Sequence, residues 1–405
     1  MKEKTKEKWL VYKKNLYICT FELKNIILNM QKIINLLVVT TLLLCTVACG
    51  KGGKNYTILG ELPKTEYNGV TVYLMDAMGN DTLGSAVIKD GQFQIKGTLE
   101  KTQMAMLITP ANNSGRFQST IVLEPGKIHI NMVNDSLYGT KMNNLFYKTF
   151  TCDTVVANLK GQMEVLLSQY YTASTPDEQK AIVMEYSRVD SLLNVHNAKH
   201  YREVFENNKK NIIGAYALNG LVQYENMSFE KLDSIMNHSN TAISEFEPLR
   251  IARTNLFHVA NTSEGKPYVD IAGIDFATGQ PTKLSAMLDT SKVTLVDFWA
   301  SWCGPCRKEI SENLIRLYDK YNQQGLNIIG VDVWERDTAD HRKAVQELGI
   351  NYPQLIDMTK KSTEEYGVDG IPTILLLGKD GIILKRNLRG EELETAVVEA
   401  LGIEQ

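Results

Sequence analysis

The sequence has little cysteine and no excess of charge of either sign. Six cysteines in 405 residues are too few for a protein held together by a network of disulfide bonds. The formal net charge is -3, so the chain as a whole has no electrostatic attraction to nucleic acid or to an anionic membrane surface. The composition therefore argues against a disulfide scaffold and against a nucleic-acid-binding protein.

Spacings typical of metal sites are also missing. A structural zinc site needs a second cysteine pair, or two close histidines, beside a Cys-X-X-Cys motif. The chain has one such motif, and among its six histidines only His196 and His200 share a helical face, without a third ligand. The sequence therefore predicts no metal site.

The one long apolar run, residues 33–48, lies near the start of the chain and is preceded by Lys32. It is shorter than the roughly 20 residues that a membrane span needs, so a cleaved export signal is favoured over a permanent span. Residues 46–50 resemble the lipobox of bacterial lipoproteins, although Thr46 stands where leucine is usual. We therefore expect a lipid on Cys49; the alternative is an uncleaved signal anchor, which also leaves the rest of the chain outside the cytoplasm.

The lead-in before this run is long and partly acidic, whereas Met30 followed by Gln31 and Lys32 opens a normal signal peptide. We expect translation to start at Met30. Residues 1–49 are then lead-in and signal, and residues 50–55 are a flexible tether.

Three patterns follow the tether, and the length allows several hydrophobic cores. From 56 to 142, short runs alternate apolar and polar residues between turns, which predicts an antiparallel β-sandwich. From 143 to 260 the period is helical, and residues 175–178 combine an N-cap, a proline and a capping-box glutamate. From 265 to 405 strand and helix patterns alternate, which predicts an α/β domain.

The predicted elements of this last domain are consistent with a mixed sheet, because residues 379–381 form a turn between its last two strands. The predicted strands are Thr294–Phe298, Asn327–Val333, Thr373–Leu377 and Ile382–Leu388. The predicted helices are Pro305–Tyr321, Thr338–Leu348 and Glu391–Leu401.

The motif Trp302-Cys303-Gly304-Pro305-Cys306 directly follows an apolar strand and opens a helix. A thiolate at a helix N-terminus is stabilised by unpaired backbone N–H groups and by the helix dipole. We therefore expect Cys303 to be the nucleophile and Cys306, one turn further on, to be the resolving cysteine. Gly304 leaves room for a partner chain, and Pro305 stiffens the loop.

Asp297 lies in the otherwise apolar run 293–298. Burial of a carboxyl group in such a strand raises its pKa. We expect Asp297 to carry the proton of Cys306.

The run VDFWASWCGPC at residues 296–306 resembles the thioredoxin superfamily, and residues 279–288 are similar to the TlpA/ResA-type envelope members. Residues 370–373 are similar to the cis-proline loop of that family, which faces the active-site disulfide and pairs with substrate backbone. Two positions depart from the family: Ser311 replaces a frequent proline, and no lysine lies near Gly330. The residues carried over by the resemblance are Asp297, Trp302, Cys303, Cys306, Ile371 and Pro372.

The resemblance implies an enzyme, a protein-disulfide reductase or interchange oxidoreductase, whose redox group is the Cys303–Cys306 disulfide without another cofactor. Its partners would be cysteine-containing exported proteins on the periplasmic side of the cell envelope, where the chain is lipid-anchored to a membrane. The Gly304-Pro305 dipeptide favours the reductive direction, with cytochrome c maturation as one family role. A membrane electron donor of the DsbD or CcdA kind is implied, because the chain encodes none.

Two other functions compete with this one. Peroxide reduction uses one cysteine in a threonine and arginine surround, and the motif 302–306 argues against it. The other is an interaction lipoprotein, in which residues 56–260 bind an envelope partner and the thioredoxin-like domain acts as a sensor. Residues 56–142 are similar, more weakly, to a domain of unknown function that is often fused to thioredoxins in envelope lipoproteins.

Overall fold

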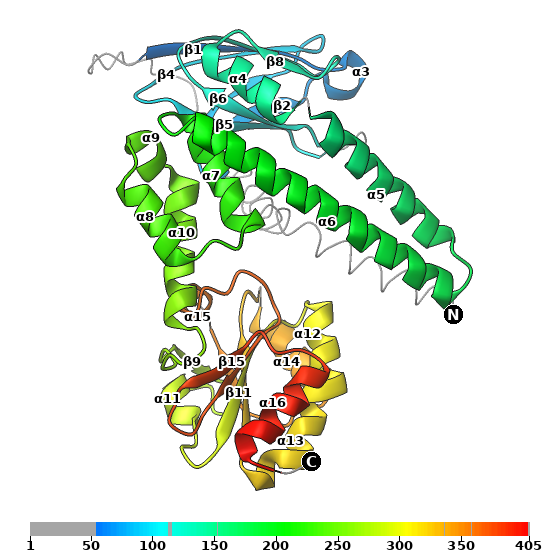
Figure 1. The fold of residues 1–405 in the computed structure, drawn as a ribbon, viewed down its shortest axis with the longest axis vertical. Coiled ribbons are helices and arrows are strands. Elements are labelled where there is room, and N and C mark those ends of the chain that lie inside the picture. The colour runs from blue at the N-terminus through cyan, green and yellow to red at the C-terminus, as the bar shows by residue number, and fades with distance from the viewer. Residues whose placement is uncertain (1–53, 112–115, 152, 336, 358, 404–405) are drawn as a thin grey trace. The chain divides into compact units, whose positions relative to one another are not determined.

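The computed structural model describes residues 54–403, apart from 112–115, 152, 336 and 358 (Figure 1). The predicted signal, the start at Met30 and the lipidation of Cys49 lie outside these residues and stay predictions. In this part of the chain, no helix has the continuous apolar length that a membrane span requires. The described residues form two compact units, 54–253 and 254–403.

Two four-stranded sheets form the β-rich part of the first unit, with the orders β4-β1-β7-β8 and β3-β2-β5-β6. The first contains β1 (Lys54–Glu61), β4 (Gln92–Leu99), β7 (Gly126–Asn131) and β8 (Ser136–Tyr138). The second contains β2 (Thr71–Asp76), β3 (Thr82–Val87), β5 (Gln103–Ile108) and β6 (Gln118–Leu123). A short helix, α3 (Lys64–Tyr67), follows β1.

The alternating pattern that predicted these strands places apolar side chains on one face of each sheet. Ile58 of β1 lies opposite Ile95 of β4 and Ile128 of β7, and all three are buried. The β-rich character is confirmed, but an entirely antiparallel region is wrong, because β1 and β7 run parallel. All four strands of the second sheet come between β1 and β7 in the chain, and parallel neighbours need such a crossover.

The start of β1 also corrects the predicted tether, since Lys54 and Asn55 already pair with β4. The helices that follow in this unit are α4 (Lys141–Phe150), α5 (Thr154–Thr172), α6 (Pro176–Asn207), α7 (Ile212–Tyr224), α8 (Phe229–Asn237), α9 (Thr241–Ser244) and α10 (Glu247–Asn261). The predicted capping box of Thr175 and Glu178 begins α6. The boundary between the two units falls within α10, earlier than the predicted limit at residue 260.

The second unit is built on a seven-stranded mixed sheet with the order β10-β9-β13-β12-β11-β14-β15. Strand β11 runs parallel to β12 and antiparallel to β14. The predicted hairpin at residues 379–381 joins β14 to β15, and these two strands are antiparallel. The strands are β9 (Ala272–Asp275), β10 (Pro281–Lys283), β11 (Val293–Trp299), β12 (Leu326–Asp332), β13 (Gln354–Ile356), β14 (Thr373–Leu377) and β15 (Ile383–Arg386).

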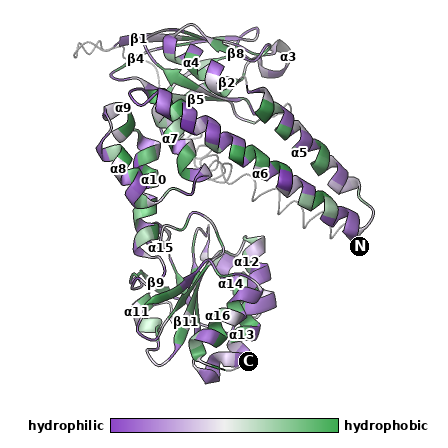
Figure 2. Ribbon diagram, in the orientation of Figure 1, coloured by the Kyte–Doolittle hydropathy of each residue, from purple (hydrophilic) through white to green (hydrophobic). Residues whose placement is uncertain are grey.

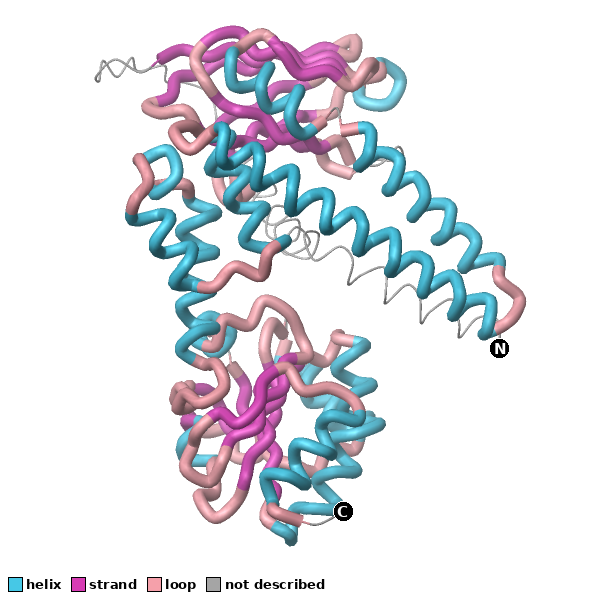
Figure 3. Tube along the Cα trace, viewed as in Figure 1, coloured by secondary structure: helices cyan, strands magenta, loops and turns pink. Residues whose placement is uncertain are grey.

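Helices cover this sheet on both sides (Figure 3). They are α11 (Leu284–Met287), α12 (Gly304–Glu309), α13 (Ile315–Tyr321), α14 (Thr338–Leu348), α15 (Lys361–Glu365) and α16 (Glu391–Leu401), with a π-helical segment, η2 (Ile310–Leu314), and a 3-10 turn, η3 (Asn322–Gln324). The predicted uninterrupted helix Pro305–Tyr321 is therefore wrong, because the π-helical segment divides it.

Every residue of β11 is buried, and the strand separates two apolar clusters. Figure 2 shows the central strands of this unit in the hydrophobic colour and much of its helical surface as hydrophilic. Leu295 and Trp299 belong to one cluster, which also contains Cys306; Val296 and Phe298 belong to the other. Side chains alternate along a strand, so Asp297 lies on the same face as Leu295, Trp299 and the helix that carries Cys306.

Candidate active site

Cys303 and Cys306 form a disulfide with an S–S distance of 1.99 Å. Cys303 is the N-cap of α12, and its Sγ accepts the backbone N–H of Cys306 at 3.2 Å. The Cys303 residue is 4% exposed, whereas Cys306 is fully buried. The geometry therefore offers the sulfur of Cys303, and not that of Cys306, to a molecule arriving from solvent.

The loop before the disulfide is held by hydrogen bonds on both sides. The backbone N–H of Cys303 donates to the carbonyl oxygen of Ala300 at 3.0 Å, and the Arg307 guanidinium donates to that of Ser301 at 3.3 Å. Arg307 also pairs with Glu347 at 2.9 Å. Pro305 stands in the first turn of α12, where no backbone donor is needed.

The loop predicted to contain a cis-proline lies beside Cys303. The Ile371–Pro372 peptide bond is cis, and the Ile371 carbonyl oxygen lies 3.7 Å from Cys303 Sγ. The sulfur carries no hydrogen in the disulfide, so this contact is not a hydrogen bond. Pro372 is buried and Ile371 is half-buried, which leaves an edge of backbone next to the reactive sulfur.

Two tryptophans border the same area. Trp302 is 40% exposed, and its indole N–H donates to the carbonyl oxygen of Trp334 at 3.2 Å. Trp334 follows β12 and has a positive φ of 57°, which places its backbone in an unusual turn conformation. Sequence reasoning singled out Trp302 but missed Trp334, since nothing in the local pattern indicates that the two loops meet.

Asp297 is the buried carboxyl group of the site, with 1% exposure. Neither of its oxygens has a hydrogen-bond partner among the described residues. Burial raises the pKa of Asp297 to about 8, the Arg389 charge acts in the opposite direction, and Glu309 adds to the rise. The raised pKa predicted from the sequence is therefore found.

Arg389 and Glu309 are the two charged residues that sequence reasoning missed. Arg389 donates hydrogen bonds to the carbonyl oxygens of Leu388 and Pro372, and burial lowers its pKa. Glu309 accepts the Asn313 side-chain N–H at 2.7 Å. The signal that could have found Glu309 is its spacing, since it lies one helical turn after Cys306.

The space near Gly330, where the resemblance led us to look for a lysine, is occupied by Gln354. A Cβ atom on Gly330 would lie 2.3 Å from Gln354 Oε1, and this oxygen accepts the indole N–H of Trp299 at 2.9 Å. The cation that influences Asp297 is instead Arg389, from the loop after β15.

Tyr352 is a further buried polar group near Asp297. It is 4% exposed, and its hydroxyl has no hydrogen-bond partner among the described residues. Burial raises the pKa of Tyr352 well above its ordinary value, and the charge of Asp297 adds to the rise. Tyr352, in the segment before β13, is therefore close enough to Asp297 for the two groups to interact electrostatically.

The π-helical segment follows α12, the short helix that contains Cys306, and includes Ser311, whose hydroxyl donates to the Lys308 carbonyl oxygen at 3.1 Å. Single π-helical turns within α-helices often lie at functional sites. Here the irregular turn occurs where the family often has proline.

The predicted histidine pair lies in the first unit, where each histidine has a partner within that unit. His196 pairs with Asp153 at 2.7 Å, and His200 contacts the Thr149 carbonyl oxygen at 2.9 Å. Their rings are stacked with centroids 6.2 Å apart.

A disulfide at the start of a helix, a cis-proline loop beside it and a buried acid below it, all on a mixed sheet, define a thioredoxin-like redox domain. The sequence model of the AhpC/TSA family matches residues 265–386, which lie within the second unit. The model of a domain of unknown function (DUF4369) matches residues 56–146.

Curated relatives of the chain are named as thiol-disulfide oxidoreductases. ResA of Bacillus thuringiensis (strain Al Hakam) is 37% identical over 95 residues, which are 24% of this chain and 54% of that protein. ResA of Bacillus subtilis (strain 168) is 31% identical over 94 residues, 23% of this chain and 51% of that protein. The chain thus spans about half the length of the curated relatives it matches.

Solved structures include similar domains. The thioredoxin domain of a thiol-disulfide oxidoreductase from Bacteroides vulgatus is 32% identical, with 34% of this chain and 96% of that chain covered and a TM-score of 0.31. A thiol:disulfide interchange protein from a Bacteroides species is 30% identical, with 35% and 92% covered and a TM-score of 0.32.

Proposed function

We propose that the chain is a thiol:disulfide oxidoreductase that exchanges electrons with cysteine pairs of exported proteins through Cys303 and Cys306. The observation that carries the proposal is the disulfide itself, in which the slightly exposed Cys303 caps a helix beside the cis-Pro372 loop and the buried Cys306 lies behind it. A buried structural disulfide would need neither the edge of backbone at Ile371 nor the exposed Trp302.

In the reductive direction, the Cys303 thiolate attacks one sulfur of a substrate disulfide. A mixed disulfide forms, and the other substrate sulfur leaves as a thiolate. The Cys306 thiolate then attacks Cys303 Sγ, which closes the internal disulfide and releases the second substrate thiolate. Two electrons thus pass to the substrate.

Asp297 is suited to take the proton of Cys306 in this second step. Its raised pKa of about 8 is close to the ordinary thiol pKa of about 8.5, and proton transfer is most efficient between groups of similar pKa. Because Asp297 shares the apolar cluster face with Cys306, we assign this proton to Asp297 rather than to bulk water.

The substrate-binding edge in the proposal consists of Trp302, Gly304, Pro305, Ile371 and Pro372. The indole ring of Trp302 offers exposed apolar area, and the cis-proline loop offers backbone to an extended partner segment. No cofactor other than the disulfide is needed for the exchange.

The direction, location and partners of the proposal rest on the sequence. The Gly304-Pro305 dipeptide favours reduction, which requires a membrane electron donor of the DsbD or CcdA kind. A lipid on Cys49 places the protein on the periplasmic side of the envelope, where cytochrome c maturation is one process that uses such a reductant. The names of the ResA relatives support the exchange chemistry.

The experiment that tests the proposal is a redox titration of the purified full-length chain in graded thiol/disulfide buffers. We expect one reversible two-electron couple with a midpoint near that of thioredoxin, about -270 mV, which is absent from Cys303→Ser. A midpoint near -120 mV, as in DsbA, would overturn the reductive direction. Absence of a reversible couple would overturn the exchange itself.

A second candidate is an envelope interaction protein, in which the first unit binds a partner and the disulfide senses redox state. We also propose that the two sheets of this unit pack as a sandwich. The observation that favours the interaction-protein candidate is helix α5, which has no buried residue along its length and exposes the side chains of Val155, Val165 and Tyr171. Retention of the biological function by a Cys303→Ser/Cys306→Ser double variant would favour this candidate over the enzyme.

A further inference from the structure

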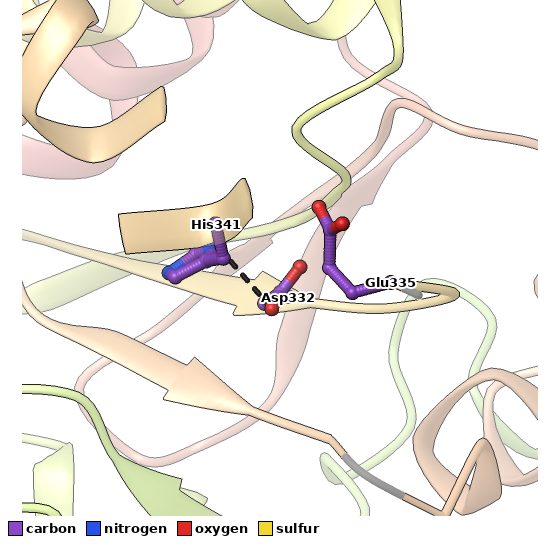
Figure 4. Close-up of side chains that lie close together, drawn as sticks. All are labelled: Asp332, Glu335 and His341. Atoms are coloured by element: carbon purple, nitrogen blue, oxygen red, sulfur yellow. Dashed lines mark ion pairs between the residues drawn. The ribbon is translucent and has the colours of Figure 1, made fainter. Parts of the chain in front are cut away.

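Three titratable side chains converge at the end of β12, beside the redox loop but outside the exchange chemistry. Asp332 is the last residue of β12, Glu335 lies in the following loop, and His341 lies in α14. One ligand atom from each lies within 4.8 Å of those of the other two. Figure 4 shows Asp332 between the His341 ring and the Glu335 carboxylate.

Two of these groups are buried without adequate partners. Asp332 is 1% exposed and His341 is fully buried. Their one mutual contact is an ion pair between His341 Nδ1 and Asp332 Oδ2 at 3.2 Å. Within the described residues, neither Asp332 oxygen and neither His341 ring nitrogen has a hydrogen-bond partner. Native proteins rarely leave buried polar atoms without a hydrogen-bond partner unless an ion or a water molecule binds to them.

Two aromatic rings pack against His341. The centroid of the Trp299 ring lies 5.0 Å from that of His341, and the Phe276 ring lies 5.2 Å away on another side. The indole N–H of Trp299 is already used by Gln354. The protein therefore supplies no second hydrogen-bond donor to Asp332 from these neighbours.

Glu335 gives the group a connection to solvent, because it is half-buried. Its oxygens accept the backbone N–H and the hydroxyl of Ser301, the hydroxyl at 3.0 Å. A carboxylate has about four acceptor sites, so these bonds leave lone pairs available for another ligand.

The charges of the Asp332 and Glu335 carboxylates indicate which kind of ligand this group would bind. Two carboxylates close together repel each other, and a divalent cation bound between them offsets this repulsion. One imidazole with two carboxylates is a donor set that suits first-row transition metals better than Mg²⁺ or Ca²⁺. Three protein ligands leave further coordination positions for water.

We propose that Asp332, Glu335 and His341 bind a divalent transition-metal ion of the Mn²⁺ or Zn²⁺ class. Sequence reasoning predicted no metal site because it considered cysteine and histidine spacing only. These ligands come from a strand end, a loop and a helix that the fold brings together. The carboxyl ends of parallel strands are also where α/β proteins place ligands.

The chain contains a matched comparison in which the protein itself satisfies the carboxylate. In the first unit, His196 and Asp153 also form an ion pair, at 2.7 Å. There the Asp153 carboxylate also accepts the backbone N–H groups of Val155 and Val156 as an N-cap, so its polar atoms are satisfied. An Asp153→Asn variant keeps a good N-cap residue and provides the control.

The test is titration of the full-length chain with Mn²⁺ alone, with free Mn²⁺ measured by electron paramagnetic resonance. The protein is kept in the disulfide form, and Mn²⁺ prefers oxygen and nitrogen ligands over thiols, so cysteines do not interfere. We expect one equivalent to bind in the unmodified chain and in Asp153→Asn, with at least tenfold weaker binding in Asp332→Asn and Glu335→Gln. Zn²⁺ should displace the bound Mn²⁺, since it binds such sites more tightly.

Glu335→Gln keeps the test valid if Asp332→Asn does not fold, because Glu335 is at the half-buried edge of the group. The disulfide couple of each variant reports folding independently. Absence of a stoichiometric site in the unmodified chain, or equal affinity in all variants, would overturn the proposal. The inference does not rest on the proposed exchange activity, and neither result changes the redox titration described above.

Discussion

Arg389 donates a hydrogen bond to the carbonyl oxygen of Pro372, the residue that completes the cis peptide bond beside Cys303. The same guanidinium opposes the rise in the pKa of Asp297. One cation therefore contacts the proposed substrate-binding loop and also influences the proposed proton acceptor. A lysine from the neighbourhood of Gly330 is not needed for this role, and Gln354 occupies that space.

Asp297→Asn should slow closure of the internal disulfide by roughly a hundredfold, because a positioned acid or base contributes about that much. In the unmodified chain the rate of this step should rise with pH through about 8, as Asp297 ionises and can accept a proton. The variant should lack this inflection. Stopped-flow measurement of the mixed-disulfide step between pH 6 and 10 checks both points; an unchanged profile in the variant would exclude Asp297 as the acceptor.

The same residue predicts how stability depends on pH. The pKa of Asp297 is raised from 3.8 to about 8 in the folded state, so the folded protein binds this proton more tightly than the unfolded chain does. Its contribution to stability is fully present below about pH 4 and is lost as pH rises through about 8. Relative to Asp297→Asn, the free energy of unfolding of the unmodified chain should fall by a few kcal/mol over this pH interval, as measured by urea unfolding. A parallel pH dependence of the two proteins would contradict the prediction.

Arg389→Met should move the inflection of the disulfide-closing rate to higher pH, since the charge that lowers the pKa of Asp297 is removed. Arg389→Lys should move it less. Arg316→Met is a suitable control, because Arg316 pairs with Glu394 at a largely exposed position and such pairs contribute little. Equal shifts in Arg389→Met and Arg316→Met would show that the effect is not specific to the site.

Cys306→Ser should accumulate a mixed disulfide with a substrate peptide on Cys303, because the group that resolves it is missing. Cys303→Ser should form almost none, since Cys306 is fully buried. Intact-protein mass spectrometry after mixing with a disulfide-containing peptide distinguishes the two adducts. Comparable trapping by both variants would reverse or abolish the assigned roles.

Trp302→Ala should raise the KM for a protein disulfide by about fivefold or more and leave the midpoint potential almost unchanged. Trp302 is 40% exposed, and truncation of an aromatic contact commonly costs about 1 kcal/mol or more in binding, which is about fivefold or more in affinity. Steady-state kinetics and the redox titration separate these quantities. A large change in potential with the same KM would place Trp302 in the redox chemistry instead of substrate binding.

Gly330→Ala should destabilise the second unit by about 1–3 kcal/mol, because the added methyl group meets the Gln354 side chain that accepts the Trp299 indole N–H. The matched control is Gly161→Ala in α5, where the added Cβ has open space and should stabilise the helix by about 1 kcal/mol. Thermal and urea unfolding measure both. Equal effects of the two variants on stability would show that the Gln354 side chain can move aside without destabilising the second unit.

The elements best predicted from the sequence are those whose ends carry local signals. α14 and α16 match their predicted limits, and each ends before a glycine with positive φ, Gly349 and Gly402. β14 also matches, since it lies between the proline loop and a hairpin turn. The short strands β9, β10 and β13 were missed because three or four residues give no periodicity.

The site was predicted where it is continuous in sequence and missed where it depends on tertiary contacts. Cys303, Cys306 and Asp297 lie on one strand and the helix after it, so local pattern was sufficient to place them. Arg389 and Tyr352 reach the same acid from distant segments. The parallel pairing of β1 with β7 was missed for a related reason, since alternation shows which face is buried but not which strand is the neighbour.

The position of β1 has a mechanical consequence. It is an inner strand of its sheet, paired with β4 on one side and with β7 on the other, and the described chain begins at its first residue, Lys54. Tension that enters the described chain at Lys54 and acts along the strand must shear both ladders at once. Peeling a single edge strand would break hydrogen bonds one after another. A pull along β1 from its N-terminal end therefore loads the β4 ladder from Lys54 and the β7 ladder from Tyr56 onward.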